Sequence, residues 1–288
     1  MAEFCLRLLI LMLVRCFVFA DFVSSETKSG DRSVSSVVNC PAPQPCECER
    51  TPGRLVLNCR EQYLDQIPRF SHSDERVDEL TLAGNRLVAL PNDAFRGLKI
   101  HRLDLTDNHL ANVSLNAFSG LEPHLEELLI QLDWVAEFPS EAVAPLTLLK
   151  VLNVIGYART SLPHGALRSF RLVRELRLTR GRLQSLSPAD VFAMRTSLSV
   201  VELSSNPLGS VPTAALATLN NLTEVSLSGC RIARLGARAF ATNRTGLRRI
   251  DLSQNQLEVR ISKITVVTYV VVNLFTVRPI LLLSLIHI

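Results

Sequence analysis

Short segments in which apolar and polar residues alternate recur at a nearly constant interval along the chain. Eight of them carry an L-x-L frame or a close variant, as in ELTLAGNRL and RIDLSQNQL. Alternation with a period of two is typical of a short, half-buried β-strand. The second apolar residues of the eight segments are Leu82, Leu105, Ile130, Val154, Leu178, Leu203, Leu227 and Leu252. They lie 23 to 25 positions apart, which predicts a solenoid with one strand in each coil.

A second column of residues follows each predicted strand at a fixed distance. Three positions after the second apolar residue stand Asn85, Asn108, Asp133, Tyr157, Gly181, Asn206, Cys230 and Asn255. An Asn amide there can satisfy backbone donors and acceptors as the chain turns away from the strand. We therefore expect a structural ladder formed by Asn85, Asn108, Asp133, Asn206, Cys230 and Asn255. Bulky residues further along each coil, such as Phe95, Phe118, Phe192 and Phe240, are expected to fill its interior.

These segments resemble the typical extracellular leucine-rich repeat, L-x-x-L-x-L-x-x-N-x-L-x-x-L-P-x-x-x-F-x-x-L, over about residues 55–259. The resemblance implies an α/β-type solenoid, a horseshoe with a concave parallel β-sheet and an irregular or short-helical convex side. Cys is a tolerated substitute for Asn in this family, so Cys230 is expected to be a buried ladder residue. The departures at Asp133, Tyr157 and Gly181 predict local irregularity in repeats three to five.

Four cysteines, Cys40, Cys46, Cys48 and Cys59, lie directly before the first repeat. In a secreted chain they indicate two disulfides, for which arithmetic alone allows three pairings. Zinc is the alternative, although the spacing lacks the paired C-x2-4-C of structural zinc sites. The segment resembles the N-terminal flanking cap of extracellular leucine-rich-repeat proteins, which implies the pairs Cys40–Cys48 and Cys46–Cys59. Such a cap would shield the apolar end of the first coil from water.

Both ends of the chain differ from the repeats. Residues 1–20 read as a signal peptide and residues 21–39 as a flexible linker, before a cap at 40–76 and about eight repeats at 77–259. Residues 260–288 form an apolar tail that Arg278 and Pro279 interrupt. It is interpreted either as a weak membrane anchor or as non-native sequence after a truncation, with a genuine packed element as a third alternative. The last coil would otherwise expose its leucines, so we expect the natural protein to continue further.

The middle repeats carry the candidate binding surface. Residues between the inward-facing leucines should point outward from the sheet, and most of them are polar. The candidate ligand-binding residues are Leu129, Gln131, Trp134, Val151, Asn153, Ile155 and Tyr157. Apolar and aromatic residues with a charged rim are typical of a protein-binding patch. The alternative is that irregular repeats bury these side chains to compensate for the missing Asn residues.

Composition and motifs narrow the function further. Leu accounts for 49 of 288 residues, the formal net charge is only +4, and the 31 Lys and Arg are spread along the whole chain, so no nucleic-acid partner is expected. The repeats hold no catalytic motif and no His or Cys cluster at ligand spacing, so we expect neither an enzyme nor a cofactor or metal site. Three sequons predict glycosylation at Asn112, Asn221 or Asn243.

These observations together favour a secretory-pathway protein located outside the cell or at its surface. Its expected role is a receptor or adhesion module that binds an extracellular protein or glycan ligand through the concave face. A membrane is involved only if the natural C-terminus carries an anchor, and a homodimer is compatible with such a module. The alternative function is a secreted structural matrix protein that resembles the small leucine-rich proteoglycans.

Overall fold

The structure is a computed structural model that describes residues 40–236, 238–240, 246–257 and 271–273. The chain divides into two units, Met1–Asn39 and Cys40–Ile288, and all described residues belong to the second. The predicted signal peptide and linker, most of the apolar tail and the sequon at Asn243 therefore lie outside the described residues.

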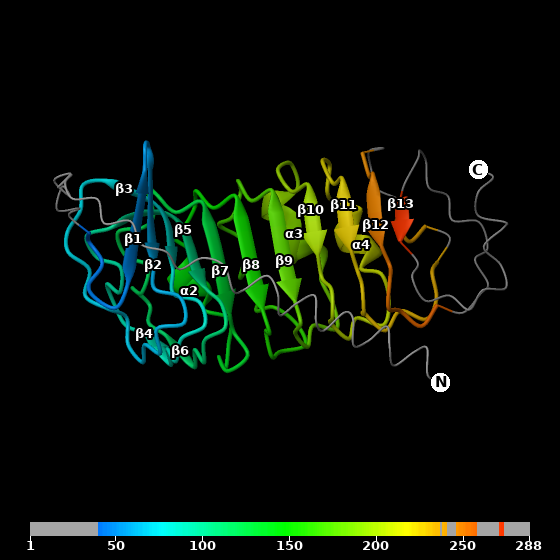
Figure 1. Cartoon of the computed structure of the whole chain (residues 1–288). Coiled ribbons are helices and arrows are strands. Elements are labelled where there is room, and N and C mark those ends of the chain that lie inside the picture. Colours follow the sequence, from blue (N-terminus) through cyan, green and yellow to red (C-terminus); the bar gives the residue numbers. More distant parts are fainter. Residues whose placement is uncertain (1–39, 237, 241–245, 258–270, 274–288) are drawn as a thin grey trace, which may run out of the picture. The chain divides into compact units, whose positions relative to one another are not determined.

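The second unit is built around an 11-stranded sheet in which strand order follows chain order (Figure 1). The N-terminal hairpin joins β1 (Glu47–Thr51) to β2 (Arg54–Asn58) in antiparallel fashion. Each following strand is parallel to its neighbour; the strands are β3 (Arg76–Thr81), β5 (Lys99–Leu105), β7 (Glu127–Gln131), β8 (Val151–Ile155), β9 (Glu175–Thr179), β10 (Val200–Glu202), β11 (Glu224–Ser226), β12 (Arg249–Asp251) and β13 (Val271–Asn273).

Each of the eight predicted segments forms one of the strands β3 to β12 in this sheet. The return paths after β3, β5, β7, β9 and β10 hold short elements, and the helices lie behind the large sheet in Figure 1. These elements are β4 (Ala89–Leu90), β6 (Asn112–Val113), α2 (Ser140–Val143), α3 (Pro188–Val191), η1 (Phe192–Met194) and α4 (Thr213–Leu216). A parallel-sheet solenoid with little helix confirms the predicted fold class.

The core is one continuous column of buried side chains between the sheet and the return path. Alternate strand residues such as Leu80, Leu103 and Leu128 point into it, and the strands' remaining residues stay half-buried on the outer face. The rings of Phe95 and Phe118 stack with their centroids 6.2 Å apart. Each coil thus buries its leucines against its neighbours, as a repeat array requires.

Phe192 departs from its expected place, because 57% of it is exposed. The coil interior at this point is filled instead by the fully buried Val191 and Met194 on either side of it. The capping box of α3, in which Ser187 and Asp190 exchange hydrogen bonds, sets the phase of this turn. With that phase, Val191 and Met194 face inward and Phe192 faces outward.

The cap closes the N-terminal end of the core. Cys40 is bonded to Cys48 and Cys46 to Cys59, the pairing that the family resemblance implied. Strand β2 pairs in parallel with β3, so the cap supplies the first two strands of the sheet, β1 and β2. At the other end, three residues from the apolar tail form β13 and pair with β12. None of the helices in the described ranges is long and apolar enough to cross a membrane.

Candidate functional site

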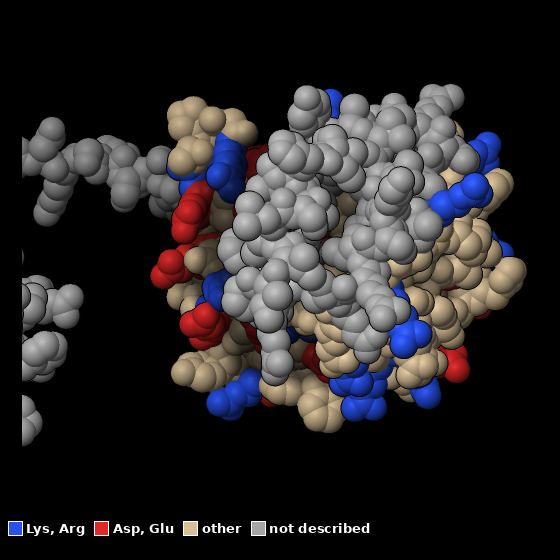
Figure 2. All heavy atoms as spheres, turned by 90° about the vertical axis from the view of Figure 1, so that its right-hand side faces the viewer, with Lys and Arg blue, Asp and Glu red and all other residues tan. Residues whose placement is uncertain are grey.

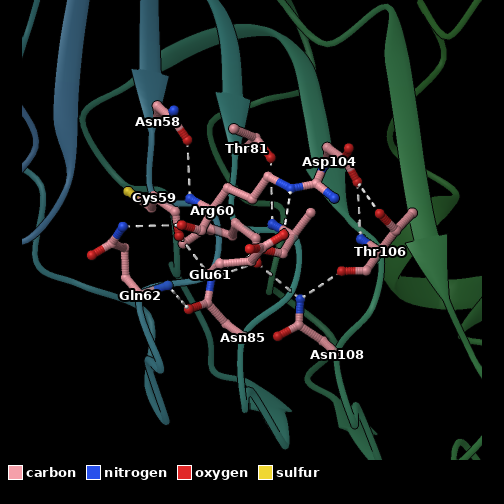
Figure 3. Close-up of polar contacts among 12 residues, drawn as sticks. Asn58, Cys59, Arg60, Glu61, Gln62, Thr81, Asn85, Asp104, Thr106 and Asn108 are labelled. Carbon is pink, nitrogen blue, oxygen red and sulfur yellow. Dashed lines mark hydrogen bonds and ion pairs between the residues drawn. The ribbon is translucent and has the colours of Figure 1, made fainter. Parts of the chain in front are cut away.

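Four asparagines hold the coils together along the edge where the strands end. Asn85 Nδ2 donates to the carbonyl oxygens of Cys59 and Leu82, both at 2.8 Å, and its Oδ1 accepts from the backbone of the preceding coil. Asn108 lies one coil further on and repeats this arrangement (Figure 3). Asn206 and Asn255 do the same in the C-terminal coils. Each amide therefore ties its own strand end to the coil before it.

Cys230 takes the same position with a thiol. Its Sγ donates to the Leu203 carbonyl oxygen at 3.2 Å, and the residue is fully buried. Burial raises the pKa of this thiol to about 11, so it stays protonated and is a poor nucleophile at neutral pH. It is a structural member of the ladder.

The ladder is interrupted in repeats three to five. Asp133 is exposed and accepts a hydrogen bond from Gln131 Nε2, so its expected ladder role is wrong. The physical reason is the preceding residue: Leu132 is fully buried, at a position that other coils give to a residue with positive φ, such as Gly84 or Gly156. The turn therefore takes another course, and the Asp133 carboxylate points outward.

Tyr157 also differs from its expected place on the binding surface, because only 3% of it is exposed. Its ring meets that of Phe138 edge to face, with centroids 5.9 Å apart, and burial raises the pKa of its hydroxyl. Gly156 has the positive φ of a regular coil, so the turn keeps its usual course and the residue in the ladder column, Tyr157, enters the core. Tyr157 thus follows the packing alternative and leaves the candidate site.

Gln131 is a structural residue as well. Its Oε1 accepts from the Asp107 backbone N–H at 2.9 Å, while its Nε2 donates to Asp133. The side chain therefore links the turns of two adjacent coils at a point where the asparagine ladder is missing.

The remaining predicted residues meet on the outer face of three neighbouring strands. The register places Asn153 of β8 between Leu129 of β7 and Arg177 of β9. Val151 and Ile155 flank Asn153 along β8, and all of these side chains are half-buried. We call Leu129, Val151, Asn153 and Ile155 the central sheet patch. Trp134 lies at the adjacent turn, 64% exposed, with its ring centroid 6.3 Å from that of His109.

Asn153 has an unusual environment within this patch. Its Oδ1 is buried and has no hydrogen-bond partner among the described residues. A buried acceptor without a donor costs about 1–3 kcal/mol. Sequence reasoning placed Asn153 on the surface but could not show this unpaired oxygen, because that depends on the register of three strands.

Ion pairs lie on both sides of the patch. Arg102 bonds Glu127 on one side, and Arg177 contacts Glu175 at 2.8 Å and Glu202 at 3.4 Å on the other. Between them the patch itself carries no charge. An apolar centre with a charged rim is the usual anatomy of a protein–protein interface.

A groove lies between the cap and the first repeat. It is an open groove of about 710 Å³, lined by residues 65–70 and by Val88 and its neighbours in the first repeat. No predicted site residue lines it. Within the described part of the chain, no group of three or more His, Cys, Asp or Glu side chains could hold a metal ion.

The repeated coil, the parallel sheet and the inward polar ladder define the class: a leucine-rich-repeat solenoid. Two family models described as leucine rich repeat match the chain, one over residues 75–133 and the other over residues 218–241. No curated protein matches it. The chain is a leucine-rich-repeat protein with a disulfide-bonded, cysteine-rich N-terminus. Such solenoids are in general protein-binding scaffolds, and typically not enzymes.

Proposed function

We propose that this protein is an extracellular receptor or adhesion module that binds a protein ligand through the central sheet patch. The observation that carries the proposal is the unpaired Oδ1 of Asn153, which lies between the apolar Leu129 and the paired Arg177 and is flanked by Val151 and Ile155. Because this oxygen has almost no exposed surface, the Asn153 amide would have to turn outward to accept a hydrogen bond from a partner, whose apolar groups would cover Leu129, Val151 and Ile155. The hydrogen bond to Asn153 would fix the orientation of the partner, and the contacts with the three apolar residues would supply the buried area.

The charged rim supports the same proposal. Arg102, Glu127, Arg177 and Glu202 are only partly exposed and already paired within the sheet. Paired charges around an apolar centre add little affinity but reject partners of the wrong polarity. Trp134 at the turn edge offers a large exposed aromatic surface, which is favoured at binding hot spots.

The extracellular location rests on the cap and on the predicted signal peptide. Two disulfides in one short segment are typical of an oxidising compartment. Of the two described sequons, Asn112 is exposed on β6, and Asn221 is exposed but donates through Nδ2 to the Thr196 carbonyl oxygen. We expect a glycan at Asn112, on the return path and not on the sheet face.

The test uses the full chain secreted from eukaryotic cells and screened against an array of purified extracellular domains. The variant Leu129→Asp with Ile155→Asp should lower the affinity for a bound domain at least thirty-fold, which is about 2 kcal/mol. The matched control is Ser226→Asp with Ser228→Asp, which adds the same charge to the same sheet face of β11 and its turn. It should retain the affinity within about two-fold. A folded, secreted chain that binds no arrayed domain, or a partner that tolerates both variants equally, contradicts the proposal.

A further inference from the structure

The two halves of the described array carry opposite charge. Residues 40–141 hold 17 Asp and Glu against 9 Lys and Arg, a net charge of −8. Residues 142–257 hold 15 Lys and Arg against 5 Asp and Glu, a net charge of +10. Because chain order is also spatial order in a solenoid, this division along the sequence becomes a division along the molecule. The mild net charge of the whole chain conceals it.

The two halves also differ in how their charges are paired. In the acidic half most cations contact a carboxylate, as in Arg50–Glu75 at 2.6 Å, Arg54–Glu79 at 3.1 Å and Lys99–Asp74 at 3.2 Å. In the basic half the described ion pairs involve Lys150, Arg177 and Arg249. The arginines of this half that make no ion pair with another described residue include Arg168, Arg171, Arg174, Arg180, Arg182, Arg231 and Arg248. Their charge is available to a ligand.

Four arginines of this half lie along one edge, at the turns that follow the strands. Arg159 follows β8, Arg180 and Arg182 follow β9, and Arg231 follows β11, and all four are exposed. We call them the arginine edge. Parallel strands lie about 4.8 Å apart, so four successive coils from β8 to β11 extend this edge over about 15 Å. Figure 2 views the C-terminal end and shows Lys and Arg gathered along its lower and right-hand margins, with most of the visible Asp and Glu at the left.

The predominance of Arg over Lys in the basic half indicates which anionic groups a ligand of this edge would carry. All but one of the 15 cations in residues 142–257 are Arg, whose planar guanidinium binds sulfate, phosphate or carboxylate oxygens through two parallel hydrogen bonds. Three of the four coils from β8 to β11 contribute arginines to this edge, and that of β10 contributes none. Guanidinium groups spread over several coils match a linear polymer with repeated anions better than they match a single small anion.

We propose that the arginine edge binds a sulfated polysaccharide. This inference rests on the extracellular location in the proposed function, because sulfated polysaccharides are the linear polyanions of that environment. Proteins that bind single-stranded nucleic acid place aromatic side chains beside the cations to stack on bases. Tyr157, two residues from Arg159, is buried, and the exposed aromatic residue of the preceding turn is Trp134, two residues before Ala136, whose carbonyl oxygen accepts a hydrogen bond from Arg159 Nε. Arg180, Arg182 and Arg231 contact no aromatic ring among the described residues. Most of the edge therefore offers charge without a stacking platform, which favours the polysaccharide over a nucleic acid.

The test measures binding of the full secreted chain to a heparin-derived oligosaccharide by calorimetry at several salt concentrations. The variant Arg180→Gln with Arg182→Gln should weaken binding at least ten-fold and lower the dependence of log K on log salt by about one to two units. The matched control is Arg69→Gln with Arg96→Gln, two exposed arginines of the acidic half, and it should change the affinity less than about two-fold. Circular dichroism of each variant verifies the fold.

Three further results would overturn the proposal, and a fourth separates it from the proposed function. Equal losses in the two arginine variants would show that only net charge matters, and unchanged binding after chemical desulfation of the oligosaccharide would exclude sulfate recognition. Tighter binding of a DNA strand of equal charge would assign the edge to nucleic acid instead. The variant Leu129→Asp with Ile155→Asp should keep its oligosaccharide affinity, so a failure of the sheet-face proposal leaves this result intact.

Discussion

Asn206 allows the contribution of the polar ladder to stability to be measured. Its Nδ2 donates to the carbonyl oxygens of Leu178 at 2.7 Å and Leu203 at 2.9 Å, and its Oδ1 accepts from Leu183 N at 3.1 Å. Each such bond contributes about 1 kcal/mol net, and each partner group left buried and unpaired has its own desolvation cost. Asn206→Ala should therefore lower the free energy of unfolding by about 3 kcal/mol.

Urea titration followed by far-ultraviolet circular dichroism measures this change. With a denaturant slope of about 3 kcal/mol per molar, the midpoint should fall by about 1 M. Cys230→Ala gives an internal comparison, because the thiol makes only weak bonds, to the carbonyl oxygens of Leu203 at 3.2 Å and Ser228 at 3.7 Å, and their loss should cost about 1 kcal/mol. Asn116→Ala, at an exposed asparagine, should stay within about 0.5 kcal/mol of the wild type.

One pattern of midpoints would show that the ladder amides do not stabilise the fold. If Asn206→Ala and Asn116→Ala shift the midpoint equally, the buried amide bonds add nothing beyond the average effect of removing an Asn side chain. A result in which Cys230→Ala costs more than Asn206→Ala would also contradict it, since the energy would then follow packing and not hydrogen bonding.

Three other perturbations test separate features. The pKa of Cys230 is raised to about 11 in the folded state, so as pH rises the thiol ionises in the unfolded state before it ionises in the folded state. The free energy of unfolding should therefore fall between about pH 9 and about pH 11. Cys230→Ala should abolish that fall in a pH series of thermal melts. Replacing Cys46 and Cys59 by Ser opens a loop whose ends are 13 residues apart, and calorimetry should show a loss of about 3 kcal/mol. Gly156→Ala should destabilise the fold more than Gly209→Ala. Both glycines have positive φ, but only at Gly156 would an added Cβ collide with a neighbour, the Asp133 carboxylate. Asp133→Ala should therefore restore part of the stability that Gly156→Ala removes.

The repeat architecture could be predicted from the sequence because its signal is repeated eight times. A single L-x-L segment would be ambiguous, but a constant interval specifies both the strands and their parallel stacking. Asn85, Asn108, Asn206 and Asn255 follow from the same register, since the ladder position is fixed by its distance from the strand.

Individual turns were harder to predict, because one residue can change the course of a coil. Leu132 occupies the repeat position at which Gly84 and Gly156 have positive φ. An apolar residue at this position indicates, in the sequence alone, that the turn differs and that Asp133 does not join the ladder. The inward direction of the column was likewise a sign that Tyr157 would be buried.

The unpaired oxygen of Asn153 and the separation of charge had no such sign in any one segment. The unpaired oxygen depends on which side chains lie beside Asn153 on β7 and β9. The separation of charge arises because the coils stack in the order of the sequence. Both are properties of stacked coils.

The interrupted ladder has a mechanical consequence. In a stack of coils each coil contacts only its neighbours, so deformation concentrates where neighbouring coils are joined most weakly, and a coil without its ladder amide lacks the bonds of that amide. The asparagines at Asn85 and Asn108 brace one block, and those at Asn206 and Asn255, with Cys230, brace another. Bending and twisting should therefore concentrate in the coils of β7 to β9, the strands that carry the central sheet patch. A ligand bound to the central sheet patch would contact the coils of β7 to β9 together and would reduce bending and twisting where the array is most flexible.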